Sequence, residues 1–174
     1  MGRFLQLEVK AQPKLVCIGK VLRHSMKELQ SGNNQLGAFW DECFETNAFA
    51  PLEAQADYVY DDSYVGLMCD WERGDDYFSY IIGMMMREGA SVPEGYETFT
   101  LEACDVGVGW IEGKDVADVC SHAHEFTQKA IEDAGHKCEK LTWCMELYNC
   151  PRFTTPDKDG YIVLDYLIPL DSAR

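Results

Sequence analysis

The sequence predicts an α+β fold in which one strand–helix–strand–strand unit occurs twice. Strand-like runs of alternating or densely apolar residues are separated by two amphipathic helical patterns, one in each half of the chain. The order of elements restarts after a turn-rich joint, giving pseudo-symmetric halves of about eighty residues near positions 14–88 and 96–170. Both helices are expected on one face of a mainly antiparallel sheet, with a groove between the halves.

The first half begins with strand patterns on either side of a proline. Alternating apolar residues in 1–12 predict an edge strand or an extended arm, which Pro13 ends. Residues 15–22 are rich in β-branched side chains and predict a second strand, and the polar run that continues to Asn34 predicts a loop. Apolar side chains then recur at helical spacing, which predicts an amphipathic helix over about residues 35–47.

Two more strands complete this half. They are predicted at residues 64–71 and 77–86, after an acidic connection over 51–62 and around a turn at Gly74. The run from 77 to 86 is almost continuously apolar, so this strand is expected to be covered on both faces.

The second half repeats this order. Residues 96–101 and 105–112 predict a bent strand pair or one interrupted strand. Within it, Gly107 and Gly109 leave one face bare, as expected where another backbone or a ligand approaches closely. A long helix is predicted next, followed by a strand around Glu146 and a last strand over 161–170. Asp115 is the expected N-cap of that helix, and Gly135 marks its end.

Length and charge restrict the classes of function. The 174 residues fit a single domain, and 30 acidic against 15 basic residues give a formal net charge of −15. Such a field repels phosphate backbones, so direct binding of nucleic acid is not expected, whereas cationic ligands are favoured. Solubility alone would also explain the charge. The sequence shows no run long enough for a membrane helix and no signal peptide, so we expect a cytoplasmic protein without membrane contact.

The eight cysteines predict neither disulfides nor a metal site. They are spread along the whole chain, mostly in apolar contexts, and read as reduced core residues. Cys120 and His124 share a helix face, but a structural zinc site needs four ligands, so we expect no metal and no cofactor.

Glu146 is the candidate functional residue of the second half. It lies in the stretch Leu141–Phe153, which predicts a buried strand, and shares a strand face with Tyr148. The other face belongs to Trp143, Met145 and Leu147. Burying a carboxylate is costly, so this one needs a reason. A structural ion pair or a solvent-exposed strand face is one interpretation. The other places Glu146 at the floor of an aromatic cavity, where it meets a cation or a proton.

Aromatic residues elsewhere in the chain are candidates for the walls of such a cavity. Their rings would add cation–π attraction to the carboxylate, although ordinary core packing explains each of them equally well. The candidate rings are Tyr148, Trp110 and Tyr80, followed by Trp71, Trp40 and Phe39.

Several short motifs resemble one known family. The segment Glu146-x-Tyr148, with residues 159–169 after it, is similar to the close of gyrase-inhibitor-like effector-binding domains. These domains form the ligand-sensing part of many AraC- and MerR-type bacterial regulators and also occur alone. The Trp40 helix and the strands Tyr77–Gly83 and Val106–Trp110 match further segments of that family.

The resemblance implies a fold, a pocket and a ligand class. The fold is a duplicated βαββ unit over residues 1–174, and the pocket is aromatic with an acidic residue that contacts cationic, lipophilic ligands. Glu146 takes that position here, with Tyr148 beside it. The sequence shows no helix-turn-helix, so we expect a stand-alone effector-binding domain rather than a one-chain transcription factor.

Three functions follow as hypotheses. The first is binding of cationic aromatic small molecules, in drug sensing or transcription regulation. The second is hydrolysis of strained, cyclopropane-type electrophiles, as some relatives perform, with Glu146 and Tyr148 as catalytic residues. The third is docking of the acidic surface on a gyrase-like protein partner. Binding is expected rather than catalysis.

Overall fold

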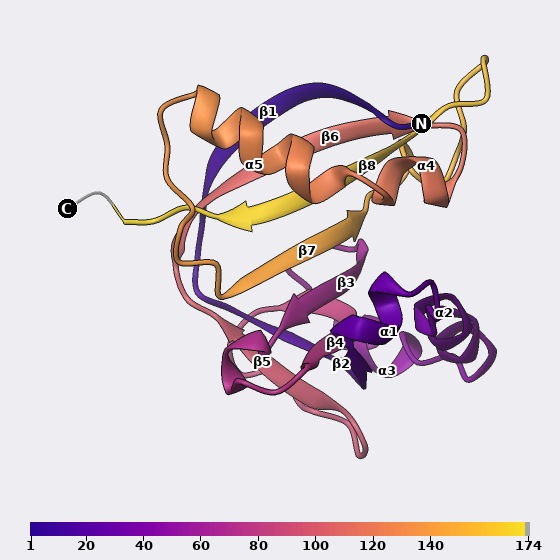
Figure 1. Ribbon diagram of the computed structural model, residues 1–174. Helices are drawn as coiled ribbons and strands as arrows, with labels where there is room; N and C mark the ends of the chain where they lie inside the picture. Colours follow the sequence, from indigo (N-terminus) through magenta and orange to yellow (C-terminus); the bar gives the residue numbers. More distant parts are fainter. Residues whose placement is uncertain (173–174) are drawn as a thin grey trace. The chain divides into compact units, whose positions relative to one another are not determined.

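The computed structural model of the chain describes residues 1–172, which form two compact units (Figure 1). Unit 2 is the continuous segment Lys14–Glu102. Unit 1 combines Met1–Pro13 with the chain from Ala103 onward. Each unit is an antiparallel sheet with helices, so the predicted α+β class is confirmed.

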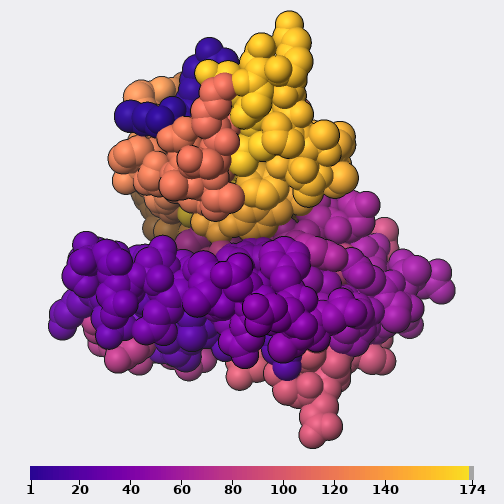
Figure 2. All heavy atoms as spheres, turned by 90° about the vertical axis from the view of Figure 1, so that its right-hand side faces the viewer, coloured from indigo at the N-terminus to yellow at the C-terminus, as the bar shows by residue number. Residues whose placement is uncertain are grey.

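Unit 2 contains a four-stranded antiparallel sheet in the order β3-β4-β2-β5. Its elements are β2 (Leu15–Ser25), α1 (Met26–Gln30), α2 (Leu36–Glu45), α3 (Ala50–Glu53), β3 (Tyr64–Cys69), the 3₁₀ turn η1 (Trp71–Arg73), β4 (Tyr77–Met86) and β5 (Glu97–Leu101). Figure 2 shows the side of this unit that bears its helices, where the violet segment between β2 and β3 forms the surface. β4 is buried from Phe78 to Met86, as its apolar sequence predicted.

Unit 1 contains a four-stranded antiparallel sheet in the order β1-β6-β8-β7. Its elements are β1 (Arg3–Gln12), β6 (Cys104–Gly113), α4 (Val116–Cys120), α5 (Ala123–Asp133), β7 (Trp143–Tyr148) and β8 (Ile162–Pro169). Both helices of this unit pack on one face of its sheet, against β6 and β8.

Two strands pair away from their neighbours in the chain. β1 precedes β2 but pairs with β6, and β5 precedes β6 but pairs with β2 (Figure 1). The strands predicted at 96–101 and 105–112 are present as β5 and β6, but the expectation of a bent strand pair or one interrupted strand is wrong, because the two strands belong to different units. The intervening residues, Glu102 and Ala103, carry the chain from one unit to the other.

Two helical predictions also need correction. The predicted loop after residue 22 contains α1, because the Ser25 side chain accepts a hydrogen bond from the Glu28 amide and caps a short helix. The predicted long helix is divided into α4 and α5 at Ser121, whose hydroxyl bonds back to the Asp118 carbonyl. Serine side chains compete in this way for the backbone groups that would continue a helix. The predicted N-cap Asp115 is confirmed, since its carboxylate accepts the Asp118 N–H at 2.9 Å.

The glycines of β6 allow α5 to pack closely against the sheet. A Cβ atom at Gly109 would lie 3.0 Å from the Cβ of Thr127 and collide with its hydroxyl, and one at Gly107 would lie 2.6 Å from Ile131. The bare face that the sequence predicted is thus covered by a helix. No helix in the described part of the chain has the length and apolarity to cross a bilayer.

Candidate functional site

Glu146 lies on β7, on the face of the unit 1 sheet that α4 and α5 cover. It is in register with Tyr166 of β8, and Tyr166 is in register with Gly109 of β6. Helix α5 packs directly against Gly109, so all three residues lie on the helix-covered face. The half-buried carboxylate accepts a hydrogen bond of 2.8 Å from the Tyr148 hydroxyl. The strand and the shared face of Glu146 and Tyr148 are therefore confirmed.

The two helices place a thiol and an imidazole over this face. Cys120, the last residue of α4, lies close to Glu146 and Tyr148, and its thiol pKa is raised chiefly by burial and then by the negative charge of Glu146. His124, in the first turn of α5, holds its Nδ1 atom 3.2 Å from the Tyr166 hydroxyl. These thiol, phenol and imidazole groups make a polar, mostly buried cluster around the carboxylate.

A chain of hydrogen bonds runs from α5 to β7. The Tyr166 hydroxyl donates to Cys144 Sγ at 3.1 Å, and Cys144 lies two residues before Glu146 on the same strand face. Burial raises the pKa of the Cys144 thiol to about 12, with Glu146 adding to the rise. Burial lowers the pKa of His124, and the carboxylate of Glu125 partly opposes that effect.

The sequence prediction did not include Tyr166, His124 or Cys144. Tyr166 stands in a strand that was recognised, but its proximity to Glu146 depends on strand register, which no local pattern specifies. His124 was considered only as a metal ligand. Within residues 1–172, no group of three or more His, Cys, Asp or Glu side chains is arranged to hold a metal ion.

The structure places Trp110 on the opposite face of the unit 1 sheet from Glu146. Trp110 is in register with Asp165, and Asp165 is in register with Leu147, so these three residues share the face that no helix of unit 1 covers. The guanidinium carbon of Arg152 lies 3.9 Å from the centre of the Trp110 ring. This face of the indole thus already has a cation against it.

Arg152 also binds Asp165 through two hydrogen bonds. Its Nε atom donates to Oδ1 at 2.9 Å and its Nη2 atom donates to Oδ2 at 2.5 Å. Asp165 is only 3% exposed, and burial raises the pKa of its carboxyl although the Arg152 cation opposes the rise. Asp165 is therefore a buried acid with an internal ion pair in this unit.

The remaining predicted residues lie in unit 2. Trp40, on α2, donates a 3.0 Å hydrogen bond from Nε1 to the hydroxyl of Tyr80, which is 1% exposed on β4. Phe39, also on α2, and Trp71, in η1, are partly buried against the same apolar core. The structure thus brings these four rings together in one core, where they pack around Met84 and Ile82.

Further aromatic residues of unit 2 escaped the sequence prediction. Phe49 stacks on Tyr64 with ring centres 3.6 Å apart, and Phe44 packs against both rings while remaining 57% exposed. The Tyr64 hydroxyl donates to Glu53 Oε1 at 2.5 Å, and burial and this carboxylate raise the pKa of Tyr64 to about 12. The spacing of Phe44, Phe49 and Tyr64 along the chain follows no single period, so no pattern revealed the cluster.

The two units share an arrangement of a tyrosine beneath a helix. Tyr80 is in register with Met68 in unit 2, as Tyr166 is with Glu146 in unit 1. Each tyrosine hydroxyl meets a ring nitrogen from the preceding helix, which is Trp40 Nε1 in unit 2 and His124 Nδ1 in unit 1. Glu146 therefore occupies the position that the apolar Met68 has in the other unit.

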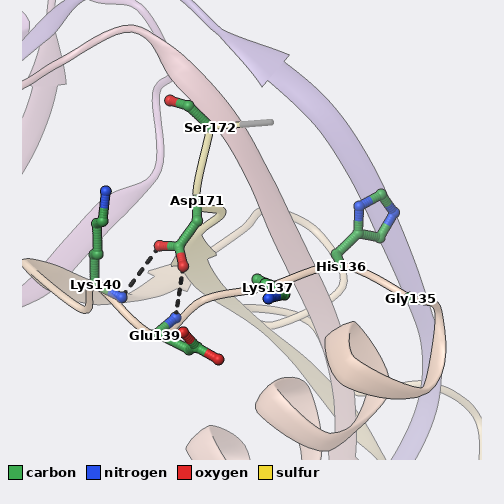
Figure 3. A pocket seen from close by; sticks show the side chains of 7 residues that line it. All are labelled: Gly135, His136, Lys137, Glu139, Lys140, Asp171 and Ser172. Carbon is green, nitrogen blue, oxygen red and sulfur yellow. Dashed lines mark hydrogen bonds between the residues drawn. The ribbon is translucent and has the colours of Figure 1, made fainter. Parts of the chain in front are cut away.

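Each unit has a surface depression of its own. One of about 550 Å³ in unit 1 is bordered by basic and acidic side chains, where the Asp171 carboxylate accepts the backbone N–H groups of Glu139 and Lys140 (Figure 3). Another, of about 480 Å³ in unit 2, is bordered by Phe39, Lys20 and Tyr96. In it the Lys20 ammonium lies 4.4 Å from the centre of the Tyr96 ring.

Solved structures of other proteins share this fold. SAV2435, in a structure bound to tetraphenylphosphonium, matches with a TM-score of 0.67 and 15% identity over 97% of this chain and 95% of its own. A Staphylococcus aureus MU50 protein described as a bacterial transcription regulation protein matches with a TM-score of 0.65 and 16% identity over 97% and 99%. An integron cassette protein of Vibrio cholerae matches with a TM-score of 0.56 and 13% identity over 98% and 99%.

The sequence itself identifies a family. No curated protein matches the chain. The family model described as integron-associated effector binding protein matches residues 8–170, which is nearly the whole chain. The resemblance to gyrase-inhibitor-like domains is thereby confirmed, and the chain belongs to the integron-associated effector binding proteins, a family of gyrase-inhibitor-like effector-binding domains.

Proposed function

We propose that the chain binds lipophilic organic cations, with Glu146 as the charge partner, in drug sensing or the regulation of transcription. The observation that supports this most directly is the setting of Glu146. Its carboxylate is half-buried on a helix-covered strand face and is held by the neutral phenol of Tyr148. Tyr148 orients the carboxylate by hydrogen bonding and does not cancel its charge.

The chemistry of this setting favours a cation with aromatic groups. A partly desolvated carboxylate attracts a cation more strongly than one in water, because the effective dielectric is lower. Phenol rings beside it add about 0.5–2 kcal/mol each through cation–π attraction. Tyr148 and Tyr166 are the rings that we propose for this role in unit 1.

The other residues predicted to bind the ligand differ in how well their surroundings suit that role. Tyr80, Trp40, Trp71 and Phe39 belong to an aromatic core in unit 2 and present the same chemistry. Trp110 is the weakest candidate, because the guanidinium of Arg152 already lies against its ring.

A fold relative supports the ligand class. SAV2435 has been solved with tetraphenylphosphonium, a cation that has four phenyl rings around one positive charge. The formal net charge of −15 of the present chain would attract such ligands at long range. That attraction is screened by salt, whereas contacts with a half-buried carboxylate are screened much less.

Titration with tetraphenylphosphonium tests the proposal. Calorimetric binding curves at 50 and 300 mM salt would compare the wild type with Glu146→Gln and with Glu139→Gln, an exposed glutamate whose change alters the net charge equally. We expect Glu146→Gln to weaken binding at least tenfold, which corresponds to about 1.4 kcal/mol. Glu139→Gln should bind like the wild type at high salt. Equal affinity of all three proteins would show that the ligand responds only to the acidic surface.

Hydrolysis is the second candidate function, and the Tyr148–Glu146 hydrogen bond is the observation that favours it. A carboxylate beside a hydroxyl can act as general base toward a water molecule while the hydroxyl assists the leaving group. Incubation with a cyclopropane-bearing alkylator and detection of the ring-opened product by mass spectrometry tests this. Product formed by the wild type and absent with Glu146→Gln would establish turnover.

A further inference from the structure

The helix-covered face of unit 1 contains a titratable group that the binding chemistry above does not use. We propose that His124 makes cation binding at Glu146 dependent on pH, because its positive charge forms next to Tyr166, the strand neighbour of Glu146. The inference rests on the proposed function and concerns the regulation of the same site.

The geometry connects the imidazole to the carboxylate through one side chain. His124 Nδ1 lies 3.2 Å from the Tyr166 hydroxyl, and the rings meet edge to face with centres 5.7 Å apart. Tyr166 is the register partner of Glu146 on the adjacent strand. Directly paired residues of an antiparallel sheet project their side chains to the same face, so Tyr166, whose hydroxyl contacts the imidazole, lies beside Glu146.

The hydrogen-bond directions define which nitrogen takes up a proton. The Tyr166 hydroxyl donates its proton to Cys144 Sγ, so its oxygen accepts from the Nδ1–H group of His124. The basic nitrogen is then Nε2, on the other side of the ring. Protonation at Nε2 leaves the contact with Tyr166 intact, and the side-chain amide of Gln128 stabilises the charged form. A positive charge can therefore form here without breaking the hydrogen-bond chain.

The titratable groups around His124 come from α5, β8, β7 and α4, and on α4 they include the Cys120 thiol, which lies beside Glu146 and whose pKa is raised by burial. On α5, Glu125 is the acidic neighbour and favours the imidazolium. On β8, the Tyr166 hydroxyl contacts His124, and on β7 Cys144 accepts the Tyr166 proton, while burial keeps the Cys144 thiol neutral. Beyond them the nearest acid on the same strand face is Glu146. The helix-facing residues of β6 near α5 are Gly107, Gly109 and Ile111, which do not titrate.

A charge at His124 opposes binding of a second cation. An imidazolium near the site repels an incoming cation and partly neutralises the field that attracts it. Burial lowers the pKa of His124 from the ordinary value of 6.5, so the neutral ring prevails at neutral pH and the charge appears in mildly acidic solution. Cation binding should therefore be strong at neutral pH and weaken as the pH falls below about 6.5.

Unit 2 lacks this sensitivity at the corresponding position. There the ring above the tyrosine is Trp40, which donates to Tyr80 from a nitrogen that does not titrate. The residue beside Tyr80 is Met68 rather than an acid. This position of unit 2 thus has no titratable ring next to its tyrosine.

Binding of tetraphenylphosphonium between pH 5 and 8 tests the inference, because this probe does not titrate and all pH dependence belongs to the protein. In the wild type we expect the affinity to fall about fivefold between pH 7.5 and 5.5 through this charge. His124→Gln should lose at least half of that fall on a logarithmic scale. His136→Gln, at an exposed histidine beyond the end of α5, should retain the whole wild-type profile.

A measurement on the unmodified protein guards against a variant that fails to fold. Binding linkage is reciprocal, so a cation bound at Glu146 must make His124 harder to protonate. The NMR titration midpoint of the His124 ring protons should move to lower pH by at least half a unit when tetraphenylphosphonium is saturating.

The outcomes separate the two proposals. If the wild type binds no tetraphenylphosphonium at any pH, or if Glu146→Gln binds equally well, the proposed function fails and this inference fails with it. If binding requires Glu146 but the pH profile is unchanged in His124→Gln, or the His124 midpoint does not move, the inference alone is overturned.

Discussion

The guanidinium of Arg152 lies 3.9 Å from the centre of the Trp110 ring while its nitrogens hold both oxygens of the buried Asp165. Arg152 thus joins the buried carboxylate of Asp165 to the aromatic ring of Trp110 within the protein. The sequence suggested the same chemistry for Glu146, with the cation supplied by a ligand. In the structure the two acids lie on opposite faces of one sheet, and Asp165 is paired with this internal cation.

Removing Arg152 should destabilise the protein. Arg152→Ala leaves Asp165 buried without its cation, and breaking such a pair costs about 2–4 kcal/mol when one partner is partly exposed. Urea denaturation measures the loss. The double variant Arg152→Met, Asp165→Leu removes both charges and should recover most of it. A loss below 0.5 kcal/mol for Arg152→Ala would mean that water replaces the guanidinium without penalty.

A methyl group at Gly109 should force α5 away from the sheet. The added Cβ would lie 3.0 Å from Thr127 Cβ and collide with its hydroxyl, so we expect Gly109→Ala to cost about 1–3 kcal/mol of unfolding free energy. Gly37→Ala is the matched control, because nothing lies within 4 Å of the added atom on the exposed surface of α2. That change should stabilise the helix by about 0.5–1 kcal/mol. Equal effects at the two sites would contradict the packing described for α5.

The buried state of His124 should make stability depend on pH. Its folded-state pKa lies below the ordinary value of 6.5, so its contribution is present above pH 6.5 and is lost as the pH falls through the folded pKa. Unfolding free energies from urea titrations should therefore decline from pH 7 to pH 5. The decline should be smaller in His124→Gln than in the wild type, and unchanged in His136→Gln. A steeper decline in His124→Gln would reverse the sign of this contribution.

The thiols should differ sharply in reactivity. Cys150 is exposed, whereas burial raises the thiol pKa of Cys43 to about 11 and that of Cys144 to about 12. Thiolate is the reacting form, so Ellman's reagent at pH 8 should modify Cys150 quickly in the folded protein and the buried thiols only after unfolding. Cys150→Ser should abolish the fast phase. A fast phase that persists would locate the reactive thiol elsewhere.

Local sequence patterns were sufficient for most of the secondary structure. β4 begins and ends where its apolar run does, and Asp115 caps α4 as its position before the helical pattern indicated. The pairing of Glu146 with Tyr148 followed from the period of a strand alone. Short elements escaped detection, because α1 has only five residues and depends on a cap from Ser25 rather than on an apolar stripe.

The sequence did not reveal which residues of neighbouring strands lie beside one another. Trp110 falls on the opposite face from Glu146 because β6 and β7 are each in register with β8 at positions that no local signal specifies. For the same reason nothing indicated that Tyr166 lies beside Glu146, or that Asp165 takes the internal cation. The sequence alone indicated an acid among aromatic rings, but the face of the sheet on which each residue lies was evident only from the structure.

The exchange of β1 and β5 has a consequence for the order of events on the ribosome. All residues of unit 2 are contiguous, so this unit can fold as soon as Leu101 has emerged. β1 is synthesised first but pairs with β6, and the whole of unit 2 separates the two strands along the chain. β1, a strand of ten residues, therefore remains unpaired while unit 2 is synthesised. Its alternation of charged and apolar side chains suits that delay, since charges on an unpaired edge discourage association with other nascent chains.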